Sequence, residues 1–280
     1  MVKGVLGIIL CPMLEDELLY SLKKDRGIDR IVLLQNRFSA LTHDKMKKRG
    51  IEFEYLPEEA FDQGRMEFDR SIYNVVIKCN DLALHAEPPK LKDHITQQVR
   101  DIQPLVDAVG LYYGICGNFG WDIVEWARKE GLKPTSVFRG DDGKVCDDCV
   151  AVAIGGSTNY NRFIKRYTGI FFLTPAIANN WEVFVMAGDS AKALESIPKE
   201  TLADLGIHNQ MDFMRWMFEV GHYENLLKMD TGLDPDLDMD KRADEIGKML
   251  NLKPIQIEDG WLTLSTAEAI YADCKSHMPA

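Results

Sequence analysis

The sequence lacks the features that would direct it to a membrane or a nucleic acid. No apolar run approaches the roughly 20 residues that span a bilayer, and the apolar stretch near the N-terminus is too short for a signal peptide followed by a cleavage site. The formal net charge of −11 disfavours attraction to phosphates or anionic lipids. We therefore expect a cytoplasmic protein with neither a membrane nor a nucleic acid as partner.

Signatures of several common enzyme classes are also missing. The sequence contains no G-x-S-x-G elbow, no P-loop and no H-E-x-x-H, which removes sequence support for the corresponding hydrolases, nucleotide-binding proteins and metalloproteases. Gly114, Gly117 and Gly120 do not fit G-x-G-x-x-G, so a dinucleotide site is not expected. The acidic segment 230–240 lacks the glycine and glutamate spacing of a calcium loop, and we expect it to be a solvated linker.

What remains is the composition of an ordinary folded protein. Of the 280 residues, 46% are hydrophobic and 28% are charged, and this length buries an adequate core without disulfides. In a reducing compartment the six cysteines should be thiols or metal ligands.

Short apolar runs alternate with helical patterns along the first two thirds of the chain. Strands are expected at residues 5–10, 30–35, 51–56, 74–78, 108–115, 135–138 and 170–174. Residues 150–154 fit a strand or a buried helix, and we favour the helix. This alternation predicts an α/β fold with a mostly parallel sheet flanked by helices.

The C-terminal third reads differently. We expect an α/β core over residues 1–190 and a mainly helical part over residues 191–280, closing with a strand at 254–257 and a helix at 265–273. From residue 191 to about 227 the pattern is almost entirely helical. Its apolar stripe from Met211 to Phe218 favours core packing and leaves a subunit interface in a homo-oligomer open.

Three cysteines follow expected strands. Cys11 comes directly after the first strand, Cys116 after the strand at 108–115, and Cys149 in the loop after 135–138. His85 follows the strand at 74–78. Because loops after parallel strands converge on one edge of a sheet, these side chains are expected to form one buried site.

The ligand set leaves the metal open. Three thiolates with the His85 imidazole suit zinc, whereas three thiolates with an open corner suit a [4Fe-4S] cluster. Cys146 and Cys149 form a C-x-x-C pair, which by itself is weak evidence for a redox or zinc site. Any single cysteine also fits a small buried hydrophobe, and whether Cys79 or Cys146 joins the site stays open.

Other groups near these cysteines have candidate roles. Gly117, with Asn118 beside it, would let the backbone approach a cofactor closely. Arg139 suits a bidentate anchor for a carboxylate or phosphate, or an ordinary salt bridge to a nearby aspartate (Asp141, Asp142 or Asp148). Glu15 and Glu17 could balance charge or move protons near Cys11, but we expect both in a solvated first turn of helix.

These residues carry a resemblance. It extends over nearly the whole chain and rests on Cys11-Pro12-Met13, Glu17-Leu18, Leu84-His85 with Pro88 and Leu91, Tyr113 to Asn118, Arg139, Asp148-Cys149, and residues 156–160 and 169–175. At these positions the sequence resembles an uncharacterised family whose genes often neighbour corrinoid-dependent methyltransferase genes in methanogens and anaerobic bacteria. It departs from that family where residues 140–147 lengthen the loop before Asp148, in place of a His-Asp-Cys triplet. The resemblance implies a shared site and a one-carbon context.

Together these observations favour a metal- or cluster-dependent enzyme acting on a small molecule. Cys11, Cys116 and Cys149 would be ligands, His85 a fourth ligand or proton carrier, and Arg139 a substrate anchor. The resemblance implies methyl or thiol transfer in corrinoid-linked one-carbon metabolism, with methanogenesis as its setting and a corrinoid protein as partner. The alternatives are an iron-sulfur lyase or redox enzyme, and a non-catalytic accessory protein that binds metal or cofactor.

Overall fold

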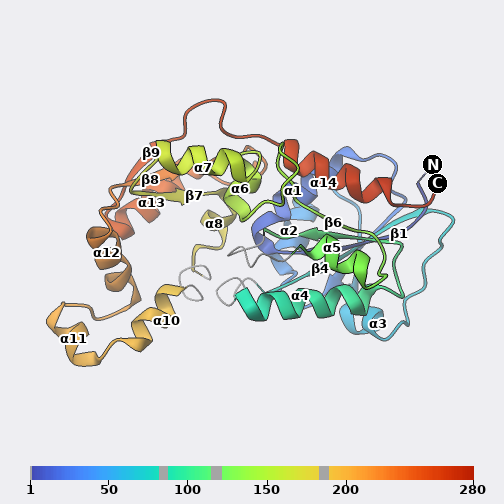
Figure 1. The fold of residues 1–280 in the computed structure, drawn as a ribbon, viewed down its shortest axis with the longest axis horizontal. Helices are drawn as coiled ribbons and strands as arrows, with labels where there is room; N and C mark the ends of the chain where they lie inside the picture. Colours follow the sequence, from blue (N-terminus) through green and yellow to red (C-terminus); the bar gives the residue numbers. More distant parts are fainter. Residues whose placement is uncertain (1, 82–87, 115–121, 183–188) are drawn as a thin grey trace.

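The computed structural model describes residues 2–81, 88–114, 122–182 and 189–280, which carry two parallel sheets (Figure 1). The first sheet has the order β3-β2-β4-β1-β5-β6, and all its strand pairs are parallel. Its strands are β1 (Gly4–Leu10), β2 (Arg30–Gln35), β3 (Glu54–Pro57), β4 (Tyr73–Cys79), β5 (Ala108–Tyr112) and β6 (Thr135–Val137). The predicted α/β fold with a parallel sheet flanked by helices is confirmed.

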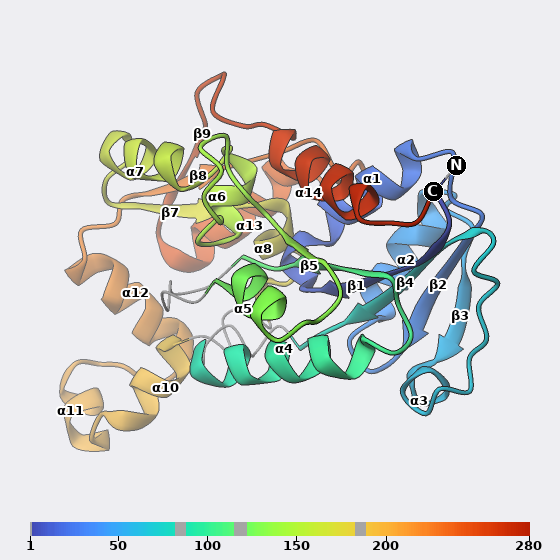
Figure 2. The ribbon, with the colours of Figure 1, turned by 45° about the vertical axis from the view of Figure 1, so that its right-hand side comes forward.

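Helices cover both faces of this sheet. They are α1 (Glu15–Lys24), α2 (Ala40–Lys48), α3 (Glu58–Asp62), α4 (Pro88–Ile102), α5 (Ile123–Lys129) and the C-terminal α14 (Ser265–Ser276). Figure 2 shows α1 and α14 side by side on one face, with α4 and α5 on the other. Strand β1 is buried along its whole length because it has no polar side chain and lies between β4 and β5.

The two faces of β1 belong to separate apolar clusters. Val5 and Ile9 pack with residues of α3, α4 and α5, whereas Leu6, Ile8 and Leu10 pack with residues of α1, α2 and α14. Successive strand residues point to opposite faces, so a continuous apolar run supplies both clusters at once.

The second sheet has three parallel strands in the order β7-β8-β9. These are β7 (Ile170–Leu173), β8 (Asn225–Lys228) and β9 (Lys253–Gln256). The helices of this part are α6 (Cys149–Ala153), α7 (Ser157–Arg166), α8 (Pro175–Asn179), α10 (Asp189–Ser196), α11 (Lys199–Asp204), α12 (Gln210–Val220) and α13 (Met239–Leu250). Helix α6 confirms the helical interpretation of residues 150–154.

One expectation for the C-terminal third was wrong. Residues 225–227 were included in the helical stretch, but they begin β8, the central strand of the second sheet. The strand has only four residues, and its partners β7 and β9 are distant in sequence, so no local periodicity marks it. The division of the chain at residue 190 stays a prediction, although β7 and β8, from opposite sides of it, pair with each other.

The chain returns to the first sheet at its end. After β9, helix α14 packs against β5, β6 and α1. The fit is close at Gly110 of β5, where an added Cβ would lie 2.9 Å from the sulfur of Cys274. The predicted closing helix is confirmed. Within the part of the chain that the structure describes, no helix has the length and apolarity to cross a membrane.

Candidate functional site

The centre of the first sheet is a topological switch point. Strand β1 leads to α1 on one face, whereas its neighbours β4 and β5 lead to α4 and α5 on the opposite face. Connections that leave adjacent strands toward opposite faces open a crevice at the carboxyl ends, where ligands of parallel sheets usually bind. Cys11 is the first residue after β1 and lies at this position.

Two backbone hydrogen bonds fix Cys11 there. Its amide donates to the carbonyl of Tyr112 at the end of β5, 3.0 Å away, and its carbonyl accepts from the amide of Leu14 at 2.9 Å. The second bond closes a short 3-10 turn, η1 (Pro12–Leu14), which leads into α1. The side chain of Cys11 is buried.

Cys149, at the start of α6, also lies near the end of β5. Asp148 caps helix α6 by accepting a 2.7 Å hydrogen bond from the amide of Ala151, so Cys149 is the first helical residue. Its half-buried side chain packs against the apolar cluster that contains Cys11 and Met13.

Gly114 shows how closely the end of β5 approaches Cys149. A Cβ at Gly114 would lie 2.6 Å from the carbonyl carbon of Asp148 and 2.9 Å from the amide nitrogen of Cys149. Only glycine permits this approach. The end of β5, at Tyr112 and Gly114, therefore contacts both Cys11 and Cys149, two residues before Cys116.

Four of the predicted site residues lie outside the described residues: Cys116, Gly117, Asn118 and His85. The part of the chain described here contains no group of three histidine, cysteine or acidic side chains that would hold a metal ion, and that part excludes Cys116 and His85. Their roles stay predictions.

Three other cysteines have a different character. Cys79, Cys146 and Cys274 are buried, and burial raises the pKa of each thiol to about 12. They are therefore protonated near neutral pH. The C-x-x-C pair is divided: Cys146 lies in the core beside β6, where its amide donates to the carbonyl of Phe138 at 2.9 Å, while Cys149 borders the site.

Arg139 lies just after β6, as expected. Its guanidinium donates a 2.9 Å hydrogen bond to the carbonyl of Gly143 within its own loop. Among the residues described, it forms no salt bridge with Asp141, Asp142 or Asp148. A role as substrate anchor stays a prediction.

The largest departure from the sequence interpretation is a buried ionic cluster. Glu15 is fully buried rather than solvated, and its carboxylate lies 2.8 Å from the amino group of Lys45 on α2. Asp234, expected in a solvated linker, is 7% exposed and lies 3.2 Å from the same amino group. Asp16 and Arg49 complete the cluster. The available signal was the acidic start of α1 followed by the basic end of α2.

A cavity of about 10 Å³, no larger than a single water molecule, adjoins Cys149 at the junction of the two sheets. It is lined by Met13, Asp16, Glu17, Cys149, Ala153, Thr174, Pro175, Ala176 and Thr231. Glu17 is half-buried, not solvated as expected, and burial together with the charge of Asp16 raises its pKa to about 8. A carboxyl group able to exchange a proton near neutral pH thus lies at the cavity that Cys149 lines.

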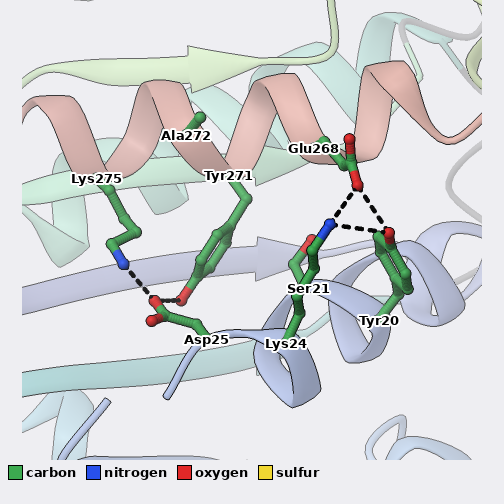
Figure 3. A pocket seen from close by; sticks show the side chains of 8 residues that line it. All are labelled: Tyr20, Ser21, Lys24, Asp25, Glu268, Tyr271, Ala272 and Lys275. Atoms are coloured by element: carbon green, nitrogen blue, oxygen red, sulfur yellow. Dashed lines mark hydrogen bonds and ion pairs between the residues drawn. The ribbon is translucent and has the colours of Figure 1, made fainter. Parts of the chain in front are cut away.

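In a second pocket, between α1 and α14, the polar side chains that line the wall pair with one another (Figure 3). The amino group of Lys24 and the hydroxyl of Tyr20 both point to Glu268, at 2.6 and 2.7 Å. Asp25 accepts from the hydroxyl of Tyr271 at 2.9 Å and pairs with Lys275 at 2.6 Å. These contacts fasten α14 to α1, so this pocket is a weaker candidate than the crevice at Cys11.

Comparison with known proteins gives one family match. The model of a family described as a protein of unknown function (DUF1638) matches residues 79–267. That range contains Cys149 and the second sheet, and it begins at the last residue of β4. No curated protein and no solved structure matches the chain.

Proposed function

Because this chain belongs to the DUF1638 family, proteins of unknown function, we propose its function from the site: a metal- or cluster-dependent enzyme with Cys11, Cys116 and Cys149 as ligands. The observation that carries the proposal is the packing of Gly114 on the Asp148–Cys149 peptide. It holds the start of the segment that leads to Cys116 against one candidate ligand. The hydrogen bond from the amide of Cys11 to the carbonyl of Tyr112 holds a second candidate ligand, Cys11, beside β5.

The chemistry of the donors fits zinc or an iron-sulfur cluster. Both favour thiolates, and a bound metal supplies the positive charge that lowers the pKa of a thiol. Cys79, Cys146 and Cys274 lack such a setting, since burial and nearby carboxylates raise their pKa values. His85 would serve as a fourth ligand or a proton carrier.

The reaction we propose is methyl or thiol transfer on a small-molecule substrate. Zinc would lower the pKa of a substrate thiol and so supply a nucleophilic thiolate near neutral pH. Glu17, at the cavity beside Cys149, would take the proton that the substrate thiol loses when its carboxyl, with a pKa raised to about 8, is ionised. Arg139 would anchor a substrate carboxylate or phosphate.

The one-carbon context comes from the family resemblance. We propose that the methyl donor is a methylated corrinoid protein of one-carbon metabolism in methanogens or related anaerobes. The substrate thiolate would attack the methyl group, the methyl–cobalt bond would break, and the cobalt would keep the bonding electron pair. A cytoplasmic location would keep the cysteine thiols reduced. This part of the proposal fails separately from the metal site: a bound metal without methyl transfer from a methylcorrinoid leaves only the site.

Metal analysis and an absorption spectrum of protein purified without oxygen test the site. About one zinc per chain in colourless protein supports the thiolate site, whereas iron, sulfide and absorption near about 400 nm support a cluster and favour lyase or redox chemistry. Stoichiometric binding of metal and substrate without turnover supports an accessory role. Protein without metal after purification and after reconstitution with either zinc or iron and sulfide would overturn the proposal.

Cysteine variants assign the ligands. Cys11→Ala, Cys116→Ala and Cys149→Ala should each lower metal content strongly, because a methyl group replaces a soft ligand. Cys274→Ala is the matched control, since Cys274 lies on α14 and its thiol is buried against Gly110 of β5. Equal metal content in the Cys149→Ala and Cys274→Ala proteins would remove Cys149 from the ligand set.

A further inference from the structure

A third pocket, distinct from the two described above, lies between the end of α1 and the segment before α13. Its volume is about 520 Å³, within the range of small-molecule sites. Four of its nine lining residues are basic and none is acidic: Lys23, Lys24, Arg26 and Arg49. This concentration of positive charge is unexpected in a chain with a net charge of −11.

The four basic side chains differ in how far their charges are compensated. Lys24 pairs with Glu268, and Figure 3 shows its amino group directed toward α14. Arg49 pairs with Asp16 and Asp234. Lys23 and Arg26, both exposed, have no acidic partner in the described part of the chain. Two positive charges at the cavity are therefore available to a ligand.

Arg49 supplies an independent observation. Its side chain is 7% exposed, and its buried Nε has no hydrogen-bond acceptor among the described residues. A buried donor without an acceptor costs free energy unless a ligand or water satisfies it. Arg49 lines the same cavity as Lys23 and Arg26.

Attraction of basic residues to the negative end of the α1 dipole does not explain all four basic side chains at the cavity. Lysines in the last turn of α1 complement the negative end of its dipole, which accounts for Lys23 and Lys24 alone. Arg26 lies beyond the helix, and Arg49 follows α2. Charges from two segments that are distant in sequence, residues 23–26 and Arg49, converge on one cavity.

The rest of the wall is apolar. Leu233 and Pro235 come from the segment between β8 and α13, and Leu19 comes from α1. Leu19 is fully buried and Leu233 is 9% exposed. The tyrosine ring of Tyr20 adds an aromatic surface. A ligand seated here would contact cations at one part of its surface and apolar groups at another.

We propose that this cavity binds a small organic phosphate monoester. Its phosphate lies among Lys23, Arg26 and Arg49, and its organic part lies against Leu233 and Pro235. The site is separate from the cysteine site, so it does not depend on the proposed metal chemistry. Because it combines α1 and α2 with the 232–235 segment, the bound ligand joins the two sheets of the protein.

Isothermal titration calorimetry of the full chain with phenyl phosphate and with inorganic phosphate tests this proposal. At constant ionic strength both should bind, phenyl phosphate more tightly because its ring covers apolar wall. The double variant Lys23→Ala/Arg26→Ala should weaken both affinities about tenfold. Both side chains are exposed, so the variant should fold, which circular dichroism verifies.

The matched control is Lys248→Ala/Arg65→Ala, which removes the same charge. Lys248 is an exposed lysine in the last turn of α13, and Arg65 is an exposed arginine that lies 3.9 Å from Glu59. Neither lines the cavity. Equal weakening in both double variants would mean non-specific attraction and overturn the site. Absence of binding to either ligand would overturn it too, and equal affinity for the two ligands would remove the apolar half of the proposal.

Discussion

Lys45 on α2 and Asp234 in the segment after β8 form a buried ion pair with an N to O distance of 3.2 Å. The amino group of Lys45 also lies 2.8 Å from Glu15 and 2.9 Å from Asp16. Burial would lower the pKa of Lys45, but attraction to Glu15 and Asp16 outweighs burial and raises it. Lys45 therefore stays charged near neutral pH and joins the segment after β8 to the first sheet.

Replacing Lys45 with methionine should destabilise the protein by about 3–5 kcal/mol, because three buried carboxylates lose their shared cation. Urea unfolding measures the change. Lys48→Met is the control, since Lys48 lies on the same helix with 64% of its side chain exposed and its nearest acidic partner, Asp236, 3.9 Å away. The double variant Lys45→Met/Asp234→Asn should recover part of the loss. Equal stability of the two single variants would contradict a stabilising role for the buried ion pairs of Lys45.

Glu17 should make stability depend on pH. Its pKa is raised from the ordinary 4.5 to about 8 by burial and by the charge of Asp16. Between these values the folded protein keeps a proton that the unfolded chain releases, so the stabilisation is complete below the lower value and is lost as pH rises through the upper one. The Glu17→Gln protein does not titrate at this position and should gain stability over the wild type as pH increases.

The comparison requires unfolding curves of wild type, Glu17→Gln and Glu224→Gln between about pH 5 and about pH 9, spanning the titration. The expected difference in slope between wild type and Glu17→Gln is below about 1 kcal/mol per pH unit, since solvent reaches part of the side chain. Glu224 is exposed, and its replacement should leave the slope unchanged. If stability changed with pH in the same way in all three proteins, the pKa of Glu17 would not be raised in the folded state.

The first sheet could be predicted because its central strands are unambiguous. Residues 5–10 and 74–78 are short apolar runs between turn signals, and burial on both faces of a parallel sheet requires that pattern. Strand β8 could not be predicted in the same way. It has two buried residues, Leu226 and Leu227, and its partners are far away in sequence. Its identity depends on pairing with β7 and β9 rather than on local periodicity.

Of the candidate site, the sequence could predict only the residues whose position follows from the end of a strand. Cys11 follows β1 and donates to Tyr112 at the end of β5, and Gly114, two residues later, packs on the amide of Cys149, in agreement with convergence at the carboxyl edge. The ionic cluster was not predictable, because an acidic first turn such as Glu15 to Glu17 is normally solvated. Only the approach of α2 and of Asp234 buries it.

Gly114 should be essential to the geometry of the candidate site. In the Gly114→Ala protein the new Cβ would lie 2.6 Å from the backbone of Asp148, so the end of β5 and the start of α6 must separate. We expect metal content to fall together with a loss of about 1–3 kcal/mol in stability. Gly27→Ala is the control, because a Cβ there meets only the side chain of Asp25 at 3.3 Å. Full metal content in the Gly114→Ala protein would contradict the proposed juxtaposition.

The cysteines should differ in their reactivity toward iodoacetamide. Cys79, Cys146 and Cys274 are buried thiols with pKa values near about 12, and only a thiolate reacts rapidly. They should stay unmodified in the folded protein near neutral pH and react after unfolding in urea. Cys149 is half-buried and lines a cavity, so it should react first among these four. Mass spectrometry of peptides from native and unfolded samples measures the order.

Repeating the alkylation with and without bound metal tests whether Cys149 is a metal ligand or only an accessible thiol. If Cys149 is a ligand, a bound metal occupies its sulfur and should slow alkylation at Cys149 while leaving Cys79 and Cys274 as unreactive as before. Removing the metal with a chelator should restore the fast reaction. If metal binding instead protects all cysteines equally, the effect is general stabilisation of the fold by a ligand. If Cys149 reacts at the same rate with and without metal, its sulfur is not a ligand.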